Sequence, residues 1–193
     1  MENVKIFVFL FDGFSDWEIA YLTPEINRSE LGDLIYFSKD GELVKSIGGL
    51  TVVPDETISG INPEDVDLMV LPGGTYWENG GDKQIAFLIK ELVALNKPVA
   101  AICAATTFLG QLGLLNEVAH TSNDLNYLKS IAPSYTGETH YRDALAISDN
   151  NVVTANGIAP IEFAQEVFKM MGFFNEEDLH KWYQLYKDGI WTD

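Results

Sequence analysis

The chain has 193 residues, of which 47% are hydrophobic and 21% charged, so its composition is that of a folded globular domain rather than a disordered segment. Twelve basic and 29 acidic side chains give a formal net charge of −17. A surface this acidic repels phosphate backbones and anionic lipid headgroups, so we expect neither nucleic acid nor a membrane as a partner.

The cysteine content and the start of the chain indicate where the protein acts. Cys103 is the one cysteine, so no internal disulfide is possible and no oxidising compartment is required. The apolar run over residues 4–11 ends at Asp12 and lacks the basic start of a secretory signal, and we interpret it as a strand. No run approaches the roughly 20 apolar residues of a membrane-spanning helix. These features predict a cytoplasmic protein.

Short, apolar, β-branched runs alternate with helical patterns, which predicts an α/β fold with a mostly parallel sheet covered by helices. In the first half of the chain we expect, in order, a strand at 4–11, a helix at 16–28, a strand at 34–38, a hairpin formed by 44–47 and 51–53, and a strand at 67–71. Pro24 should kink the first helix or limit its first part, because proline lacks the N–H that a helix interior requires.

In the second half we expect, in order, a helix at 84–96, a strand at 99–102, a helix at 106–112, a short strand around Val118, a helix at 123–131, strands at 144–147 and 152–155, and helices at 161–171 and 176–187. The last helix carries an aromatic stripe that is more typical of a core or a subunit interface than of a ligand site. No linker, repeat or low-complexity stretch interrupts the pattern. We therefore expect one domain over residues 1–193, in which residues 175–193 form a C-terminal helical extension.

Cys103 lies where a predicted buried strand meets a helix, between Ala101 and the pair Ala104-Ala105. A catalytic nucleophile on such a sharp turn is flanked by small residues, because bulkier ones would collide. A helix N-terminus also offers free N–H groups and a positive dipole end, both of which favour thiolate over thiol. Most free cysteines are buried and inert. Here the position at the strand-to-helix turn favours a reactive cysteine.

A glycine pair ends the neighbouring predicted strand, in the segment Pro72-Gly73-Gly74. Glycine lets the backbone approach a ligand closely and direct an N–H group at it. The N–H groups of Gly74 and Ala104 are therefore candidates for an oxyanion hole beside Cys103. The alternative is that the glycines form a plain turn.

Together these segments resemble the ThiJ/PfpI family, which includes the parkinsonism-associated deglycase and intracellular proteases and belongs to the class I glutamine amidotransferase-like superfamily. The resemblance rests on residues 8–13 leading to Glu18, and on residues 70–74, 101–105 and 154–157. It implies a flavodoxin-like αβα sandwich, usually a homodimer, in which Cys103 is the nucleophile on an elbow turn and Glu18 lies against its sulfur.

The resemblance gives Glu18 a chemical role that depends on its protonation state. An ionised carboxylate would raise the pKa of the Cys103 thiol by repulsion, whereas a protonated one that donates a hydrogen bond to sulfur would lower it. Partial burial would keep Glu18 protonated. Without the matched position, Glu18 would be interpreted as one more acid on a surface helix.

The third catalytic member differs between branches of the family. In the protease-like branch a histidine directly follows the cysteine, but Ala104 stands there in this chain, so that triad is absent. In other branches a histidine from a later strand approaches the thiol, and His120 matches it as a general base or proton relay. A histidine packed at a strand end is the equal alternative. The late His-x-Glu pair of glutaminase domains is also absent, which argues against glutamine hydrolysis.

No dinucleotide or phosphate-loop motif is present, and His120, His140 and His180 lack metal-ligand spacing, so we expect no cofactor and no metal. The leading hypothesis is a thiol-dependent enzyme whose substrate is a small carbonyl, amide or acyl compound, with glyoxalase- or deglycase-like and hydrolase- or amidase-like chemistry both open. One alternative is a stress-response redox sensor in which Cys103 is oxidised to a sulfinate that Glu18 stabilises. Another is an inactive scaffold that binds a partner.

Overall fold

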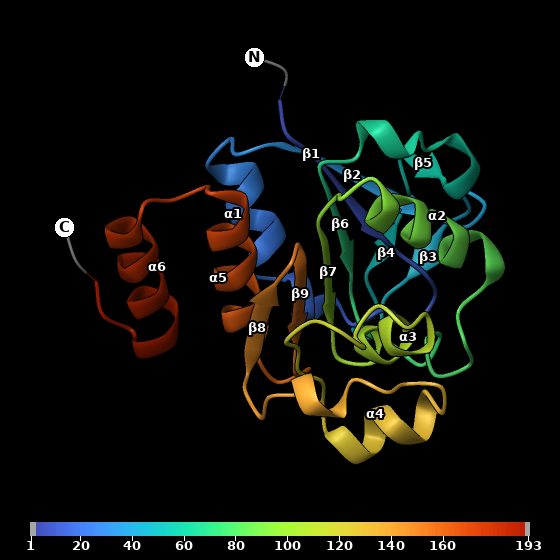
Figure 1. Ribbon diagram of the computed structural model, residues 1–193. Helices are drawn as coiled ribbons and strands as arrows, with labels where there is room; N and C mark the ends of the chain where they lie inside the picture. Colours follow the sequence, from blue (N-terminus) through green and yellow to red (C-terminus); the bar gives the residue numbers. More distant parts are fainter. Residues whose placement is uncertain (1–2, 192–193) are drawn as a thin grey trace.

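Seven strands form one sheet in the computed structural model, which describes residues 3–191 (Figure 1). The strand order is β5-β2-β1-β6-β7-β9-β8. The strands are β1 (Lys5–Phe9), β2 (Asp33–Ser38), β5 (Glu56–Thr57), β6 (Leu68–Leu71), β7 (Val99–Ile102), β8 (Ala146–Asp149) and β9 (Val152–Ala155). Every neighbouring pair is parallel except β8 and β9, which are antiparallel. The predicted mostly parallel α/β sheet is therefore confirmed.

Helices cover both faces of this sheet (Figure 1). One face carries α1 (Leu22–Arg28) and α5 (Pro160–Met171), with α6 (Glu176–Asp188) packed on the outer side of α5. The other face carries α2 (Lys83–Ala94) and α3 (Ala105–Gln111), and α4 (Leu125–Ile131) packs beside α3. Within residues 3–191, no helix is long and apolar enough to cross a membrane.

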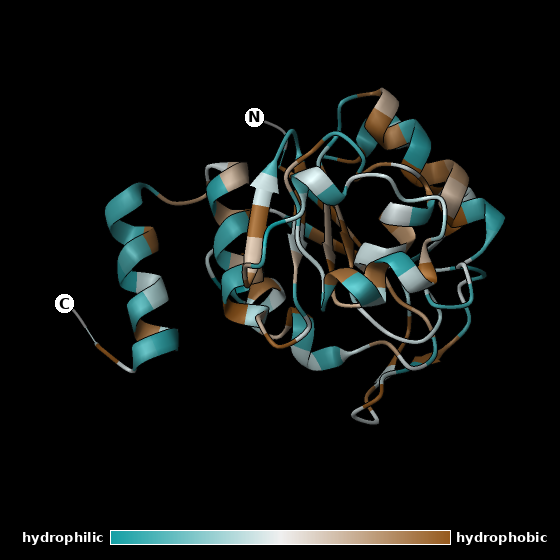
Figure 2. Cartoon of the chain, turned by 60° about the horizontal axis from the view of Figure 1, so that its bottom comes forward, coloured by the Kyte–Doolittle hydropathy of each residue, from teal (hydrophilic) through white to brown (hydrophobic). Residues whose placement is uncertain are grey.

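The centre of the sheet is apolar on both of its faces. All residues of β6 and β7 are hydrophobic and buried. Strands covered by helices on both sides have continuous apolar sequences, which is why these two segments are the clearest strands in the sequence. Figure 2 shows the contrast with α6, whose surface is hydrophilic over most of its length.

The predicted helix at 16–28 is divided in the structure. A short 3-10 helix, η1 (Asp16–Ile19), is followed by Ala20 and Tyr21 and only then by α1. Pro24 thus lies in the first turn of α1, where a missing N–H breaks no helical hydrogen bond. Ala20 and Tyr21 keep right-handed helical dihedrals, so the backbone coils continuously through all three parts.

Two details of the region after α3 differ from the sequence-based expectation. The strand expected around Val118 is not formed, and the chain there makes one parallel bridge, between His120 and Tyr141. The side chain of Asp124 accepts hydrogen bonds from two N–H groups of the next turn. This N-cap starts α4 at residue 125 rather than at the predicted residue 123.

The remaining elements follow the prediction closely. The hairpin is confirmed, because β3 (Val44–Lys45) pairs antiparallel with β4 (Thr51–Val52). The other predicted helices occur within a residue or two of their expected bounds. The chain also contains the short 3-10 helices η2 (Ile58–Gly60), η3 (Pro63–Asp65) and η4 (Glu138–His140).

Candidate active site

The carboxyl end of β7 leads into a strained turn that carries Cys103. This residue has a φ of +61°, in the left-handed region that residues other than glycine seldom adopt. Its N–H donates to the carbonyl of Ala155 (2.9 Å), and its own carbonyl accepts from the N–H (3.1 Å) and the hydroxyl (2.6 Å) of Thr106. These bonds tie the turn to β9 and α3, so the predicted strand-to-helix elbow is present.

Two glycines from other parts of the chain make room for Cys103. A Cβ at Gly73, after β6, would lie 2.6 Å from the Cβ of Cys103. A Cβ at Gly157, after β9, would lie 2.7 Å from its Sγ. Both distances are shorter than real Cβ contacts, so a larger residue at either position would displace the cysteine. The sequence predicts that the residues beside Cys103 must be small. The structure extends this requirement to the glycines that follow β6 and β9, the strands on either side of β7.

Glu18 is fully buried. Its carboxyl group and the side chain of Cys103 both pack against Gly73, because a Cβ at Gly73 would be too close to each of them. Glu18 comes from η1, and its Oε2 accepts a hydrogen bond of 2.6 Å from the Gly73 N–H. Its other oxygen, Oε1, has no well-formed hydrogen bond among the described residues, although the side chains of Cys103 and Ser15 lie beside the carboxyl group. Glu18 is therefore not an acid on a surface helix.

Burial decides the protonation of Glu18. Desolvation raises the pKa of its carboxyl group to about 7, against smaller lowering effects from the Gly73 N–H and from the Cys103 and Ser15 side chains. At neutral pH both the protonated and the ionised forms of this carboxyl group are therefore populated. The protonated form can donate a hydrogen bond, whereas the ionised form can accept a proton.

The surroundings of Cys103 also disfavour ionisation of its thiol. Burial, followed by the charge of the Glu18 carboxylate, raises the pKa of the thiol to about 11. Asn123 and the Ala104 N–H lower this pKa by smaller amounts. The sequence suggested that the start of the following helix would favour the thiolate, but burial outweighs that effect. Protonation of Glu18 removes its repulsion, so the two groups titrate as a coupled pair.

Asn123 contacts the sulfur and was not identified from the sequence. Its Nδ2 donates to Sγ of Cys103 (3.3 Å), while its Oδ1 accepts from the N–H of Gly157 (2.9 Å). The second bond requires the amide oxygen to face Gly157, so the NH₂ group faces the sulfur. The carbonyl of Asn123 in turn accepts from Nδ2 of Asn156 (2.9 Å). The family resemblance rests in part on the segment 154–157. Nothing in the sequence around Asn123 indicated that this residue would bind that segment.

Tyr127 and Glu78 form a second contact that sequence reasoning missed. The Tyr127 hydroxyl, on α4, donates to Oε1 of Glu78 in the loop after Gly74 (2.8 Å). Burial raises the pKa of Tyr127, and the charges of Cys103 and Glu18 add to this effect. The bond therefore joins α4 to the loop after β6 within electrostatic range of the thiol.

Of the two predicted oxyanion-hole donors, Ala104 directly follows Cys103 and Gly74 follows Gly73, which packs against Cys103. The N–H of Ala104 is directed at the sulfur and therefore lowers the pKa of the thiol. Gly74 adjoins Gly73 and has a φ of +148°, and a Cβ there would lie 2.6 Å from a ring carbon of Phe11. The backbone conformation at this turn thus requires glycine. That both N–H groups point at one substrate oxygen stays a prediction.

The structure does not bring His120 to the sulfur. The residue is fully buried, with Nδ1 bonded to the carbonyl of Val118 (2.7 Å) and Nε2 to the hydroxyl of Tyr135 (2.6 Å). Both ring nitrogens are thus engaged away from Cys103. Burial also lowers the pKa of His120, which favours the neutral ring. His120 is thus a packed histidine, as in the alternative interpretation, although it makes an isolated bridge to Tyr141 and does not end a strand.

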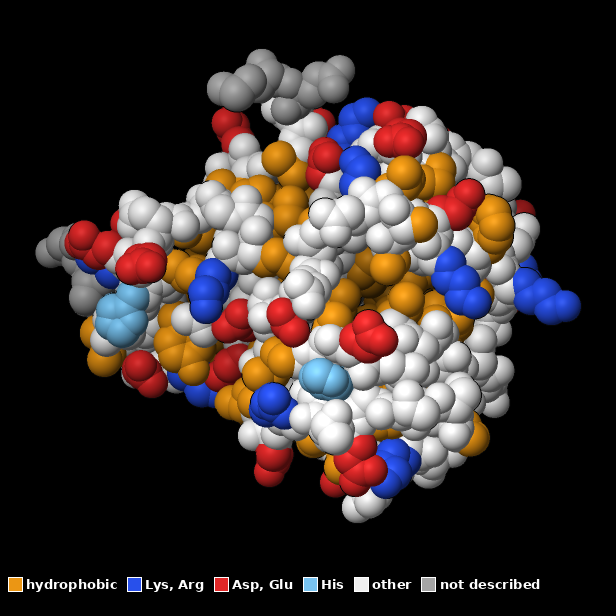
Figure 3. Space-filling view, in the orientation of Figure 1, with side chains coloured by type: hydrophobic (Ala, Val, Ile, Leu, Met, Phe, Trp, Pro, Cys, Tyr) orange, Lys and Arg blue, Asp and Glu red, His pale blue; other side chains and the backbone are white. Residues whose placement is uncertain are grey.

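Charged side chains do not form a separate patch on the face shown in Figure 3, where Lys and Arg lie among Asp and Glu. Within the described part of the chain, no three His, Cys, Asp or Glu side chains are grouped so that they could hold a metal ion. The candidate site accordingly consists of a thiol, a buried carboxyl group, one side-chain amide and backbone N–H groups.

These features define a flavodoxin-like α/β protein with a cysteine at a strand-to-helix elbow. The chain belongs to the DJ-1/PfpI family, whose model matches residues 4–170. The match covers every element from β1 to nearly the end of α5 and leaves α6 outside. The family resemblance inferred from the four sequence segments is therefore confirmed.

Relatives of known name extend over most of the chain. It is 38% identical over 199 residues to the uncharacterized protease YoaZ of Bacillus subtilis, which covers 97% of this chain and 92% of that protein. It is 31% identical over 123 residues to a deglycase of Thermococcus kodakarensis, which covers 62% of this chain and 72% of that protein.

Solved structures show the same architecture. A DJ-1 superfamily protein of Agrobacterium tumefaciens is 41% identical, with a TM-score of 0.87 over 96% of this chain and 98% of that one. A ThiJ/PfpI family protein of Bacillus anthracis is 39% identical, with a TM-score of 0.92 over 98% of this chain and 93% of that one. Both alignments are long enough to include the region after residue 170.

Proposed function

We propose that the protein is a cysteine-dependent enzyme that acts on a small carbonyl, amide or acyl compound. The observation that carries this proposal is the contact between a strained Cys103 and a buried Glu18 whose pKa is close to neutral. Local backbone strain and a shifted carboxyl pKa beside a nucleophile are features of reactive sites. The relatives named as an uncharacterized protease and as a deglycase are consistent with thiol chemistry at a carbonyl carbon.

In the first step the sulfur of Cys103 attacks the carbonyl carbon of the substrate. The thiol proton passes to the Glu18 carboxylate, the C–S bond forms, and the electron pair of the C=O bond moves onto oxygen. The N–H groups of Gly74 and Ala104 donate to this oxyanion. Glu18 then returns its proton to the oxygen of an aldehyde adduct or to the nitrogen of an amide that leaves as an amine.

The second step depends on the substrate class. With an amide or acyl compound, departure of the amine or alcohol leaves a thioester on Cys103, which water hydrolyses to an acid and the free thiol. With a 2-oxoaldehyde, a proton moves from the first adduct carbon to the neighbouring carbon, and hydrolysis of the resulting thioester gives a 2-hydroxy acid. Glu18 is the group placed to move protons in both routes.

Asn123 acts as a positioning residue in this scheme. Its NH₂ group donates to the sulfur and stabilises the thiolate relative to the thiol, because hydrogen bonds to ionised groups are stronger than those to neutral ones. His120 has no part in the scheme, because both its nitrogens are bonded elsewhere.

We further propose that the enzyme works in the cytoplasm as a homodimer and belongs to a stress response, as the family resemblance implies. Residues 1–193 would form one domain with residues 175–193 as its C-terminal extension. Sedimentation of the purified protein at several concentrations measures the oligomeric state, and a monomer at every concentration would contradict the dimer.

Turnover of 2-oxoaldehydes, small amides and acyl esters by the purified protein tests the proposed activity. We expect turnover of at least one class, and a loss of about 1,000-fold or more in Cys103→Ser, which keeps the shape of the side chain but weakens the nucleophile. Turnover that survives this change would overturn the cysteine mechanism. Addition of two oxygen atoms by peroxide, with no turnover of any class, would support the redox sensor instead. An unreactive thiol without turnover would support the scaffold.

A further inference from the structure

Helix α6 lies outside residues 4–170, yet it contacts Tyr21 and Glu25, which follow the short helix that carries Glu18. In Figure 1 it forms the outermost layer, beyond α5. Two of its side chains bind it to α5, because the hydroxyl of Tyr183 (2.9 Å) and Nζ of Lys187 (2.7 Å) both contact Oε1 of Glu162. Other residues of α6 reach past α5 to α1.

The contact between α6 and α1 is centred on the buried carboxylate of Glu25. The indole N–H of Trp182 donates to Oε2 of Glu25 (3.1 Å), which also accepts from Arg28 (2.7 Å). Glu25 is only 4% exposed and Trp182 only 7%. The bond pairs a largely buried carboxyl oxygen with a largely buried indole N–H, so it links α6 directly to α1.

A second contact lies one turn further along α6 and reaches the start of α1. The ring of Tyr186 meets the ring of Tyr21 edge to face, with centroids 5.3 Å apart. Tyr21 is the second of the two residues that join η1 to α1. Edge-to-face packing is a favourable arrangement of two aromatic rings. Trp182 and Tyr186 thus hold the first turn of α1, at Glu25 and at Tyr21.

The backbone between these contacts and Glu18 is stiff. Ala20 and Tyr21 have right-handed helical dihedrals, so no extended residue separates η1 from α1. The hydroxyl of Thr23 donates to the carbonyl of Ile19 (3.2 Å), which adds a cross-link between the two helices. A displacement of α1 is therefore transmitted to Glu18.

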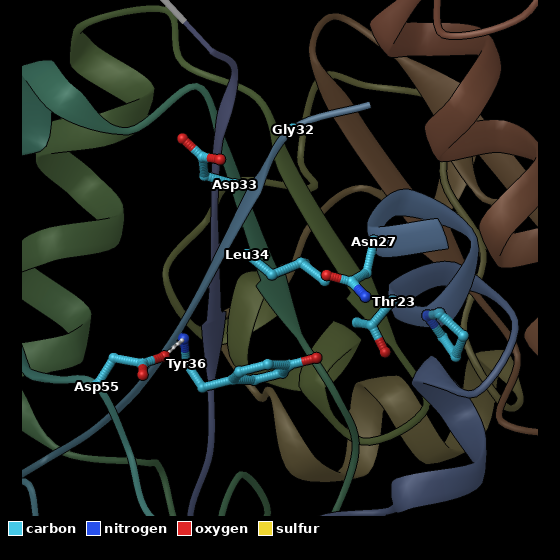
Figure 4. Close-up of a pocket in the computed structure, with 8 residues that line it drawn as sticks. Thr23, Asn27, Gly32, Asp33, Leu34, Tyr36 and Asp55 are labelled. Atoms are coloured by element: carbon cyan, nitrogen blue, oxygen red, sulfur yellow. Dashed lines mark hydrogen bonds between the residues drawn. The ribbon is translucent and has the colours of Figure 1, made fainter. Parts of the chain in front are cut away.

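On the side of α1 that faces β2, the packing is open. A hollow of about 580 Å³ lies between the two elements, with Thr23 and Asn27 of α1 opposite Leu34 and Tyr36 of β2 (Figure 4). This hollow leaves space into which α1 can shift. Outside this hollow α1 packs against both β2 and α5, and α6 adds the contacts of Trp182 and Tyr186.

We propose that α6 is a positioning element for the active site, in which Trp182 and Tyr186 hold η1 and α1 so that Glu18 stays dry and close to Cys103. The proposal rests on the proposed function, because it assigns α6 a role in the chemistry of that site. Release of α1 would admit water to Glu18. Since desolvation is the largest influence on this carboxyl group, its pKa would fall toward the ordinary value of 4.5.

The rate of Cys103 alkylation by iodoacetamide, measured against pH, reports this change. In a coupled pair the rate rises up to the pKa of Glu18, about 7, and then levels off, because the pair has lost its first proton and the share of molecules whose remaining proton is on Glu18 rather than on sulfur does not change with pH. The height of the plateau falls tenfold for each unit by which the pKa of Glu18 falls. Both the inflection and the plateau are insensitive to a loss of stability alone.

The test compares Trp182→Phe with Tyr183→Phe in the full-length protein. Each variant removes one hydrogen-bond donor from α6 and keeps an aromatic ring, but only Trp182 bonds to α1. We expect Trp182→Phe to move the inflection down by about half a pH unit or more and to slow alkylation on the plateau by about 3-fold or more. Tyr183→Phe should keep the wild-type profile.

Equal profiles for Trp182→Phe and the wild type, or equal shifts in both variants, would overturn the inference. Tyr186→Leu provides the same test if Trp182→Phe does not fold, since Tyr186 is 38% exposed and its loss leaves no buried polar group unpaired. If Glu18→Gln has the same alkylation profile as the wild type, the proposed function itself is contradicted. The two failures are therefore distinguishable.

Discussion

Glu18 and His120 are both titratable, fully buried side chains, and the sequence suggested both for the site, yet their surroundings differ. Each ring nitrogen of His120 has a close hydrogen-bond partner within the fold. Glu18 has one strong partner in the Gly73 N–H and one oxygen without a well-formed hydrogen bond, next to a thiol. The fold thus gives hydrogen-bond partners to both ring nitrogens of His120 but to only one of the two carboxyl oxygens of Glu18.

This difference shows how a buried polar group is distinguished as structural or chemical. Stability is served when every donor and acceptor is paired, as for His120. A buried carboxyl group with a raised pKa lowers the stability of the fold at pH values above its ordinary pKa. Such groups are found where proton transfer is part of the chemistry. Substitutions at the two positions should therefore have opposite effects on stability and on chemistry.

Of the substitutions that separate the two positions, Glu18→Gln should have the largest effect. The glutamine keeps the size of the side chain but cannot exchange a proton, so turnover should fall by about 100-fold or more. Turnover at saturating substrate, measured against pH, checks this, and the inflection near pH 7 should disappear. Unchanged turnover would remove Glu18 from the mechanism.

The same substitution should stabilise the protein in alkaline solution. The pKa of Glu18 is raised from 4.5 to about 7 in the folded state, so its contribution to stability is complete below pH 4.5 and is lost as the pH rises through 7. Glutamine carries no such charge. Urea unfolding at pH 8 should show Glu18→Gln more stable than the wild type by up to about 3 kcal/mol, with the difference shrinking toward pH 5. A less stable variant at pH 8 would contradict the raised pKa.

A smaller effect is expected for Asn123→Ala. The variant removes the amide that donates to the sulfur, so the thiolate loses one hydrogen bond and the pKa of Cys103 should rise further. Turnover and alkylation at neutral pH should both fall by about 10-fold. Asn156→Ala, which removes the support of Asn123 without touching the sulfur, should have a weaker effect in the same direction.

His120→Gln should affect stability and leave the chemistry almost unchanged. Loss of a buried hydrogen-bond pair lowers the free energy of unfolding by about 1–3 kcal/mol. Tyr135→Phe, which breaks the same bond from the other side, should behave alike. Alkylation profiles of both folded variants should match the wild type. A shifted profile in His120→Gln but not in Tyr135→Phe would return His120 to the mechanism.

The parts of the site that the sequence predicts are those in which local patterns act alone. The apolar runs of β6 and β7 are buried on both faces, so strand, turn and Cys103 follow directly from the residues. Glu18 could be placed only through the family resemblance, because its own surroundings in the sequence are those of a solvated helix. Its burial results from long-range packing of η1 against the loop after β6.

The parts that could not be predicted depend on contacts between distant loops. Asn123 reaches the sulfur because Asn156 and Gly157, in a loop 33 to 34 residues later in the sequence, bind it. His120 was matched to the thiol only through the family resemblance, with a packed histidine as the equal alternative, and its bond to Tyr135 shows where its ring lies. The division of the helix at 16–28 likewise follows from tertiary contacts together with Pro24.

The most direct test of the central claim is an infrared titration of the carboxylic acid C=O band in the wild type and in Glu18→Gln, from about pH 4 to pH 9. The account predicts a protonated carboxyl band that persists above the range of ordinary acids, disappears with a midpoint near pH 7, and is missing in Glu18→Gln. A wild-type spectrum in which all such absorption is lost by about pH 5.5 would show that Glu18 is an ordinary carboxylate and would contradict the account.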